Sequence, residues 1–391
     1  MKARMLLTLV VSYLWLSGAN ATEMLVEKQT FTTTNFTTVG GKTIPDVTIG
    51  WEAYGELNEA KDNVILITHF FSGNSHAAGK YTAADPQPGY WDAIIGPGKA
   101  IDTNKYYVIS TDTLVNAFPH LPHVITTGPA SINPATGKPY GLDFPVVTIR
   151  DFVNVQHALL TSLGINKLHA VVGASMGSLQ AIEWATAYPD MVERMVSVIG
   201  TAAMDAWTIT GLEHWARAIK LDPNWNQGNY YEGDAPIAGL ASTLTLITQQ
   251  AMHPISFNQA SPQQETLPKA GLESVLNDLP ATEFWFSAAA KNAVFADANH
   301  ILYLVRANQL FIAGHQNDLA TGLRQIKAKT LFLPAKHDLL LQPYLAQQAV
   351  ATLKELGQAP EYDEIDGIFG HLDGLYSIQS KADVLAEFLA K

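Results

Sequence analysis

The sequence contains no cysteine, and this absence removes several kinds of chemistry at once. A chain without Cys forms no disulfide, thiolate–zinc site or iron–sulfur cluster, and it offers no Cys nucleophile. Positive charge is also scarce, since 24 Lys and Arg stand against 36 Asp and Glu and give a formal net charge of −12. A general nucleic-acid binder needs a basic face to neutralise phosphates, so we expect no nucleic-acid partner.

Charged residues of either sign make up 15% of the 391 residues, whereas hydrophobic residues make up 47%. This composition is typical of a folded chain with a large core and argues against disorder. The length suits one large domain, or a core with an inserted subdomain. After the first residues no segment resembles a transmembrane span, so we expect no stable membrane anchor.

The N-terminus resembles a cleavable export signal. Lys2 and Arg4 precede an apolar run over residues 5–16, and small residues then lead to Ala21. This order is typical of a secretory signal peptide, here residues 1–21. An uncleaved anchor or a wrongly predicted start of the chain is the alternative, although the run is too short to span a bilayer comfortably. We therefore expect an exported protein that is periplasmic or secreted.

Short apolar runs alternate with helical patterns along much of the chain. Strands are predicted at residues 64–67, 106–110, 168–172, 195–199 and 330–333. Thr148 and Asp151 form a capping box before a helix that ends at Gly164, a second helix runs to Pro189, and a last one covers 382–389. Such alternation predicts an α/β fold with a mostly parallel sheet covered on both faces.

Residues 202–325 break this alternation. They have helical patterns, are rich in Trp, Gln, Asn and Ala, and lack clear strand-like runs. We interpret the stretch as a helical cap inserted between two late strands. The expected division is a signal peptide at 1–21, the first part of the core at 22–201, the cap at 202–325 and the rest of the core at 326–391.

A candidate nucleophile lies between a predicted strand and a predicted helix. Residues 173–177 read Gly-Ala-Ser-Met-Gly and fit the pattern G-x-S-x-G. Small residues two positions either side of Ser175 allow a sharp turn, which raises the hydroxyl above the sheet and points the N-terminus of the helix at it. The bare pattern occurs by chance, and an ordinary tight turn is the alternative.

A serine hydroxyl needs a base, and the base needs an acid to orient it. With this turn, the order along the chain is Ser, acid, His. Asp338 follows the predicted strand 330–333, and His371 is the one histidine beyond it. The sequence thus predicts Ser175 as nucleophile, Asp338 as orienting acid and His371 as general base and acid. A role of Asp338 as a helix cap and Asp366 as a rival acid remain open.

An oxyanion hole needs two hydrogen-bond donors. One is expected to be the N–H of Met176, directly after the nucleophile, and the other comes from the loop over residues 69–73. No motif indicates a nucleotide cofactor or a metal site, so we predict no cofactor. The expected partner is a small-molecule ester or acyl donor.

Several segments resemble the homoserine O-acetyltransferase family, an acyltransferase branch of the α/β-hydrolase superfamily. The resemblance implies an α/β-hydrolase fold with a helical cap, the Ser175, Asp338 and His371 triad, and oxyanion donors at Met176 and Phe71. It also supports the expectation of a homodimer. The similar segments are WEAYGELN at 51–58, WDAIIGPGKAID at 91–102, TGPAS at 127–131, PYG at 139–141, VVTIRD at 146–151 and GASMGSLQAIEW at 173–184.

The chain departs from that family where the substrate is recognised. The family has an Arg after a Gly-Leu pair that matches residues 239–240, but none stands here between Arg217 and Arg306. Leu372 replaces an Asp that follows the family's catalytic His, and Asp373 comes one position late. Without the bidentate Arg, a substrate carboxylate loses a strong and specific contact.

These departures, together with the export signal, lead us to expect an exported carboxylic-ester hydrolase acting through a Ser-His-Asp triad and an acyl-enzyme. One alternative is an O-acyltransferase of the homoserine O-acetyltransferase type. A second is a binding protein that keeps the α/β-hydrolase fold without catalysis, since a fold does not guarantee an activity.

Overall fold

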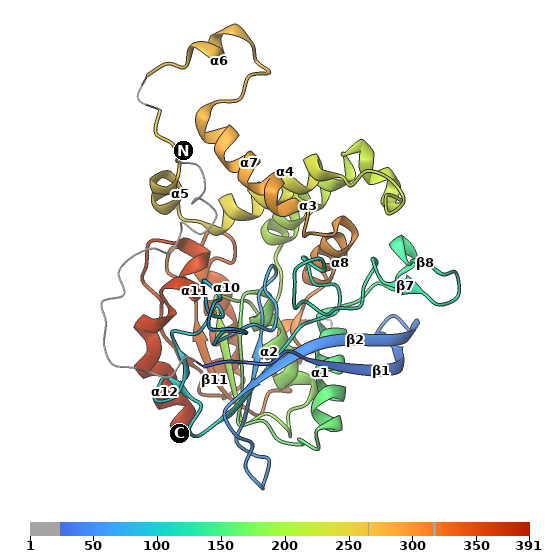
Figure 1. Ribbon diagram of the computed structural model, residues 1–391. Coiled ribbons are helices and arrows are strands. Elements are labelled where there is room, and N and C mark those ends of the chain that lie inside the picture. The colour runs from blue at the N-terminus through green and yellow to red at the C-terminus, as the bar shows by residue number, and fades with distance from the viewer. Residues whose placement is uncertain (1–23, 265, 316–317) are drawn as a thin grey trace.

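Figure 1 shows the computed structural model, which describes residues 24–264, 266–315 and 318–391. The expected signal peptide lies outside these residues, so the signal peptide and the export stay predictions. Within the described part of the chain an eight-stranded sheet has the order β1-β2-β6-β3-β9-β10-β11-β12. Its strands are β1 (Gln29–Thr37), β2 (Thr43–Tyr54), β3 (Val64–Thr68), β6 (Tyr107–Thr111), β9 (Ala170–Ala174), β10 (Arg194–Val198), β11 (Lys329–Leu333) and β12 (Glu361–Tyr362).

The sheet is mostly parallel, which confirms the expected α/β class. The pairs from β6 through β12 are all parallel, while β2 is antiparallel to both β1 and β6. Two small two-stranded sheets pair β4 (Ile95–Gly96) with β5 (Ile101–Asp102) and β7 (Ile132–Asn133) with β8 (Lys138–Pro139).

The central strands are buried on both faces, which explains why the sequence of β3 has no alternation of polar and apolar residues. Val64 and Leu66 belong to one apolar cluster, together with side chains of α1, α2 and α10. Ile65 and Ile67 belong to a second cluster on the other face, together with side chains of α12 and of residues 77–101. Because successive side chains of a strand point to opposite faces, a strand covered on both sides is apolar throughout.

The helices connect these strands. The predicted capping box is present, since the Thr148 side chain and the Asp151 side chain each accept the other residue's backbone N–H at the start of α1. The helices are α1 (Ile149–Ser162), α2 (Met176–Ala187), α3 (Ala206–Lys220), α4 (Ile237–Ala251), α5 (Pro254–Ala260), α6 (Lys269–Glu273), α7 (Pro280–Ala293), α8 (Ala298–Gln309), α9 (Leu319–Leu323), α10 (Pro343–Glu355), α11 (Asp373–Tyr376) and α12 (Ala382–Ala390). None of the helices described is both long enough and apolar enough to cross a membrane.

The helices α3 to α9 all lie between β10 and β11 along the chain. Figure 1 shows α3, α4 and α7 together at one end of the molecule, beyond the sheet, with α6 on a segment that projects further out. This arrangement places helices over the sheet edge where parallel strands end and where α/β proteins bind their ligands. The division of the chain at residues 202 and 325 stays a prediction.

Candidate active site

Ser175 lies in the turn between β9 and α2, where the backbone is strained. Its φ of 56° and ψ of −121° are unusual for a residue with a side chain. Neighbouring backbone leaves no room for side chains on the flanking glycines. A Cβ on Gly173 would lie 2.1 Å from the carbonyl oxygen of Gly177, and one on Gly177 would lie 1.9 Å from that of Thr68. The two small residues of the motif therefore permit the turn that exposes the serine.

The structure brings the three predicted triad residues together. The Ser175 Oγ lies 2.7 Å from Nε2 of His371, and Nδ1 of His371 lies 2.6 Å from Oδ2 of Asp338. The other carboxylate oxygen of Asp338 accepts hydrogen bonds from the backbone N–H groups of Leu340 and Leu341, at 2.8 and 2.9 Å. All three side chains are buried, so water competes little for these bonds.

The rival acid lies elsewhere. Asp366 is largely exposed, forms an ion pair with Lys336 at 2.9 Å, and lies 3.5 Å from Nε2 of His337. The structure places Asp338, and not Asp366, against His371. In the described chain Asp338 caps no helix, because the next helix, α10, begins only at Pro343. Its Oδ1 instead accepts hydrogen bonds from backbone N–H groups of the turn that follows. The turn and His371 therefore use different oxygens of one carboxylate.

The residues directly after His371 explain the departure noted in the sequence. Leu372 lines the pocket in front of the serine. Asp373 is fully buried, and its carboxylate bonds to neighbouring residues of its own chain segment. It accepts hydrogen bonds from the Ser377 hydroxyl, at 2.5 Å, and from the Phe369 backbone N–H, at 3.2 Å. Burial raises the pKa of the Asp373 carboxyl, and the hydrogen bonds oppose that rise. Asp373 therefore does not replace a pocket carboxylate.

The two residues predicted as oxyanion donors lie close to the serine, because Met176 follows it in the chain and Phe71 lines the same pocket. Met176 is the first residue of α2, and Phe71 lies in the loop after β3. Within the part of the chain that the structure describes, neither backbone N–H donates a hydrogen bond. The positive end of the α2 dipole also lies at this point. Free donors beside a nucleophile are the arrangement that an oxyanion hole requires.

Buried polar residues hold the loop that carries Phe71, and the sequence analysis did not single them out. Asp112 accepts a hydrogen bond from the Ser75 backbone at 2.8 Å, and the Asn116 side-chain amide donates to the Gly73 carbonyl at 3.0 Å. Lys28 pairs with Asp112 at 3.1 Å, with both side chains almost completely buried. No sequence signal marks these residues, because they are dispersed along the chain and meet in the fold.

Glu52 completes this network from β2. Burial alone would raise the pKa of its carboxyl, but a hydrogen bond from His76, the charge of Lys28 and the hydroxyl of Tyr81 lower the pKa to about 2. Glu52 is therefore ionised at neutral pH although it is fully buried. An ionised carboxylate with several donors is a rigid anchor for the loop that bears Phe71.

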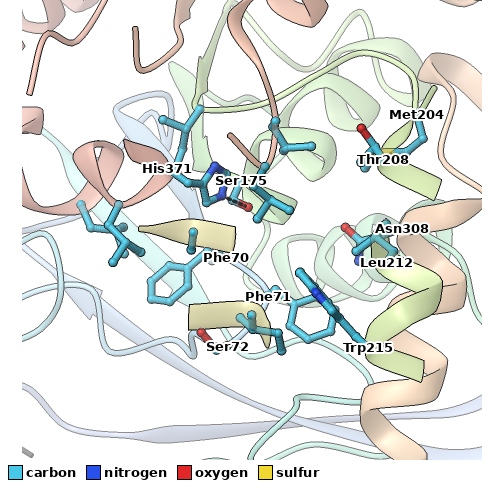
Figure 2. A pocket seen from close by; sticks show the side chains of 17 residues that line it. Phe70, Phe71, Ser72, Ser175, Met204, Thr208, Leu212, Trp215, Asn308 and His371 are labelled. Carbon is cyan, nitrogen blue, oxygen red and sulfur yellow. Dashed lines mark hydrogen bonds between the residues drawn. The ribbon is translucent and has the colours of Figure 1, made fainter. Parts of the chain in front are cut away.

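In front of the triad lies a hollow of about 660 Å³, counted with its opening to solvent. Figure 2 shows Ser175 and His371 on one side of it and residues of the cap helices on the other. Its wall is mostly apolar, as with Leu212 and Leu372. Trp215 packs edge-on against Phe71, with ring centroids 5.3 Å apart, and its indole N–H donates to the Gln250 side chain. These contacts fix the aromatic wall beside the oxyanion loop.

A second hollow adjoins the first. It measures about 1240 Å³ with its opening and shares Ser72 and Ile247 with the pocket of the triad. Its far wall includes Phe284 and Trp285 of α7. Among the described residues, no group of three or more His, Asp and Glu side chains is placed to hold a metal ion.

The chain is similar to known proteins over most of its length. The family model described as alpha/beta hydrolase fold matches residues 127–366, which confirms the expected superfamily. A curated homoserine O-acetyltransferase from Methanohalobium evestigatum is 39% identical over 90% of this chain and 70% of its own length. Another, from Carboxydothermus hydrogenoformans, is 35% identical over 95% of this chain and 97% of its own length.

Two solved structures of high similarity have different names. The crystal structure of esterase E22 is 57% identical, covers 93% of this chain and 100% of its own, and has a TM-score of 0.91. The structure of homoserine O-acetyltransferase from Bacillus anthracis is 39% identical, covers 94% and 98%, and also has a TM-score of 0.91. The same backbone therefore occurs under both names, and the fold alone does not identify the acyl acceptor.

The curated relatives correct the first functional expectation. The prediction of a carboxylic-ester hydrolase is wrong, because the curated relatives are named homoserine O-acetyltransferases and support the acyltransferase alternative; they do not test export. They are named as enzymes, so the binding-protein alternative also receives no support. The resemblance noted in the sequence is confirmed over most of the chain. The chain belongs to the homoserine O-acetyltransferase-like family of the α/β-hydrolase superfamily.

Proposed function

We propose that this chain is an O-acyltransferase of the homoserine O-acetyltransferase type, which carries the acyl group on Ser175. The observation that supports the proposal most is the 2.7 Å contact between the Ser175 hydroxyl and Nε2 of His371, at the wall of an apolar pocket. A hydroxyl and an imidazole at this distance are within reach of proton transfer. The curated relatives supply the reaction type.

The first half-reaction loads the serine. The acyl donor places its carbonyl carbon next to the Ser175 Oγ, and the hydroxyl proton passes to Nε2 of His371 as the new C–O bond forms. The negative oxygen of the tetrahedral intermediate accepts hydrogen bonds from Met176 and Phe71, each worth about 100- to 1000-fold in rate. His371 then returns the proton to the leaving group, the bond to that group breaks, and an ester on Ser175 remains.

The second half-reaction transfers the acyl group. An acceptor hydroxyl gives its proton to Nε2 of His371 and attacks the ester carbonyl, and the same two backbone donors stabilise the intermediate. Ser175 leaves and takes the proton back from His371. Asp338 accepts a hydrogen bond from Nδ1 throughout, so that Nε2 is available to receive each proton.

A transferase must favour the acceptor over water. Water is present in large excess, so the acceptor competes by binding close to the ester in an oriented form. The apolar wall of the pocket supports this requirement, because it binds the carbon chain of an acceptor and offers few partners to water. The adjoining second hollow gives the leaving group of a bulky donor a place to lie.

The test uses the full chain with p-nitrophenyl acetate or acetyl-CoA as donor and a panel of acceptors that includes homoserine and neutral alcohols. We expect the rate of donor consumption to rise with acceptor concentration, and mass spectrometry to find the acetylated acceptor. Donor consumption that ignores every acceptor and yields acetate alone would overturn the proposal. A Ser175→Ala variant measured in parallel reports the background reaction.

We further propose that the chain forms a homodimer through its projecting segment. The segment, residues 266–279, carries exposed apolar side chains, and Val275 and Leu276 are 100% and 89% exposed. Exposed apolar side chains that gather in one place are typical of interaction sites. A second copy offers the same apolar surface, so a two-fold contact would bury both segments at once.

For this contact, sedimentation velocity at several concentrations is the measurement. The natural chain is expected to sediment as a dimer, and a Val275→Asp, Leu276→Asp variant as a monomer, because a buried contact with four unpaired carboxylates is unfavourable. Leu221→Asp is the matched control, since Leu221 is 81% exposed but lies at the end of α3, outside the segment. A dimer that survives the double substitution, or a natural chain that is monomeric, would contradict the proposal.

A further inference from the structure

The side of the pocket opposite the triad carries two polar groups without partners. Thr208 of α3 and Asn308 of α8 both line the hollow, and both are about nine-tenths buried or more, at 4% and 5% exposed. The hydroxyl of Thr208 is buried and has no hydrogen-bond partner among the described residues. The Asn308 amide N–H₂ donates to the Leu304 carbonyl at 2.8 Å, and its oxygen accepts no hydrogen bond within the described chain. Native proteins rarely leave such groups unpaired.

The position of these groups relates them to the substrate. Figure 2 shows Thr208 and Asn308 on the cap side, across the hollow from Ser175 and His371. The helices that carry them, α3 and α8, pack against each other. A ligand that reacts at Ser175 and extends through the hollow therefore meets both groups with its other end.

No charged side chain of the described residues lines that end of the hollow, although the Asp205 carboxylate, outside its lining, accepts the Thr208 backbone N–H at 2.8 Å. Among the described residues that line the hollow, none is Asp, Glu, Lys or Arg. The arginines of the two helices point elsewhere, since Arg217 pairs with Glu213 and the Arg306 guanidinium donates to the Gln309 side chain. A carboxylate in this place would be buried near Asp205 without a cationic partner, and an ammonium group would meet no counter-charge among the described lining residues; both are unfavourable.

The chemistry of the two groups defines what fits. A threonine hydroxyl both donates and accepts, and an asparagine oxygen accepts. A neutral hydroxyl on a ligand can accept from Thr208 and donate to Asn308 at the same time. Between this end and the serine the wall is apolar, with Leu212 on α3 as an example, so the connecting part of the ligand is a hydrocarbon chain.

We propose that the acyl acceptor of this enzyme is a neutral alcohol with an apolar chain and a second neutral hydrogen-bonding group, which Thr208 and Asn308 select. The inference rests on the proposed acyl transfer and specifies its acceptor. An amino-acid alcohol such as homoserine, which carries both charges, is then a poor acceptor. Thr208 and Asn308 determine specificity and take no part in the proton transfers.

The experiment compares α,ω-diols of increasing length with mono-alcohols of the same length and with homoserine, with p-nitrophenyl acetate as donor. For the best length, kcat/KM of the diol is expected to exceed that of the mono-alcohol by about 10-fold, the value of a hydrogen bond to a group otherwise left unpaired. Homoserine is expected to be at least about 100-fold worse than that diol, because both charges lose their hydration.

Thr208→Val tests the selecting group, because it keeps the shape and removes the hydroxyl. The ratio of kcat/KM for the diol to that for the mono-alcohol is expected to fall to about one, and Thr208→Ser is expected to restore it. Thr210→Val is the matched control, since Thr210 lies on the same helix and its hydroxyl donates to the Ala206 carbonyl. A preference that survives Thr208→Val, or homoserine as the best acceptor, would overturn the inference and leave the transferase proposal intact.

A different outcome would separate the two proposals. If no alcohol accelerates donor consumption, acyl transfer is overturned, and with it the assignment of the alcohol as acceptor. The same alcohols then serve as competitive inhibitors of donor hydrolysis. Their inhibition constants show whether the pocket prefers the diol and whether Thr208→Val removes that preference, so the neutral character of the pocket is upheld or rejected independently.

Discussion

Replacing Ser175 with alanine is expected to reduce turnover of p-nitrophenyl acetate by about 10⁴- to 10⁶-fold, the range found when a triad nucleophile is removed. The variant keeps the oxyanion donors and the pocket, but no acyl ester can form. The substitution removes one oxygen from a strained turn, so the fold is expected to persist. Initial rates and the intact mass of the protein after incubation with donor are the two measurements, and an acetyl adduct is expected in the natural chain alone.

Ser178→Ala provides the control for this substitution. Ser178 lies in α2, three positions after Ser175, and is fully buried. Its hydroxyl contacts the Ser197 hydroxyl at 2.9 Å, and Ser178 does not line the pocket. We expect its activity to stay within a few-fold of the natural chain. Should Ser175→Ala retain activity within about tenfold, the acyl group is not carried on Ser175, and the proposed mechanism fails.

The sequence predicted the central strands and the elbow because each depends on local patterns. The apolar runs that became β3, β6, β10 and β11 were placed within a residue or two, since strands buried on both faces carry a continuous signal. The Gly-Ala-Ser-Met-Gly turn is local as well. The first hairpin was missed because β1 is rich in Thr and largely exposed, so its strand has no apolar run to mark it.

The parts of the site that depend on distant contacts were beyond the sequence. Thr208 and Asn308 are a hundred positions apart and come together through the packing of two cap helices. Lys28 and Asp112 meet over Gly50 of β2, where a side chain would collide with both of them. The choice between Asp338 and Asp366 also needed the fold, because both acids follow late strands and one of them turns to the surface.

The second large effect is expected from Asp338→Asn, which we expect to lower kcat by about 10⁴-fold. The carboxylate uses Oδ1 to accept from the Leu340 and Leu341 backbone and Oδ2 to accept from Nδ1 of His371. An asparagine keeps its oxygen towards the two backbone donors and thus turns its N–H₂ group towards the imidazole. Nδ1 must then accept the hydrogen bond, so the proton of the neutral ring moves to Nε2.

That tautomer cannot take the proton of Ser175, because Nε2 is already protonated, although the geometry of the triad is retained. The measurement is kcat with p-nitrophenyl acetate, together with a thermal unfolding curve that shows whether the fold has survived. Asp366→Asn is the matched control: it makes the same chemical change on the rival acid, whose partners Lys336 and His337 are at the surface, and we expect no change in kcat. A large loss in Asp366→Asn with an active Asp338→Asn would assign the orienting role to the other acid. Loss in Asp338→Asn alone, with the fold intact, is the result that follows if one carboxylate oxygen sets the tautomer of His371 while the other secures the turn.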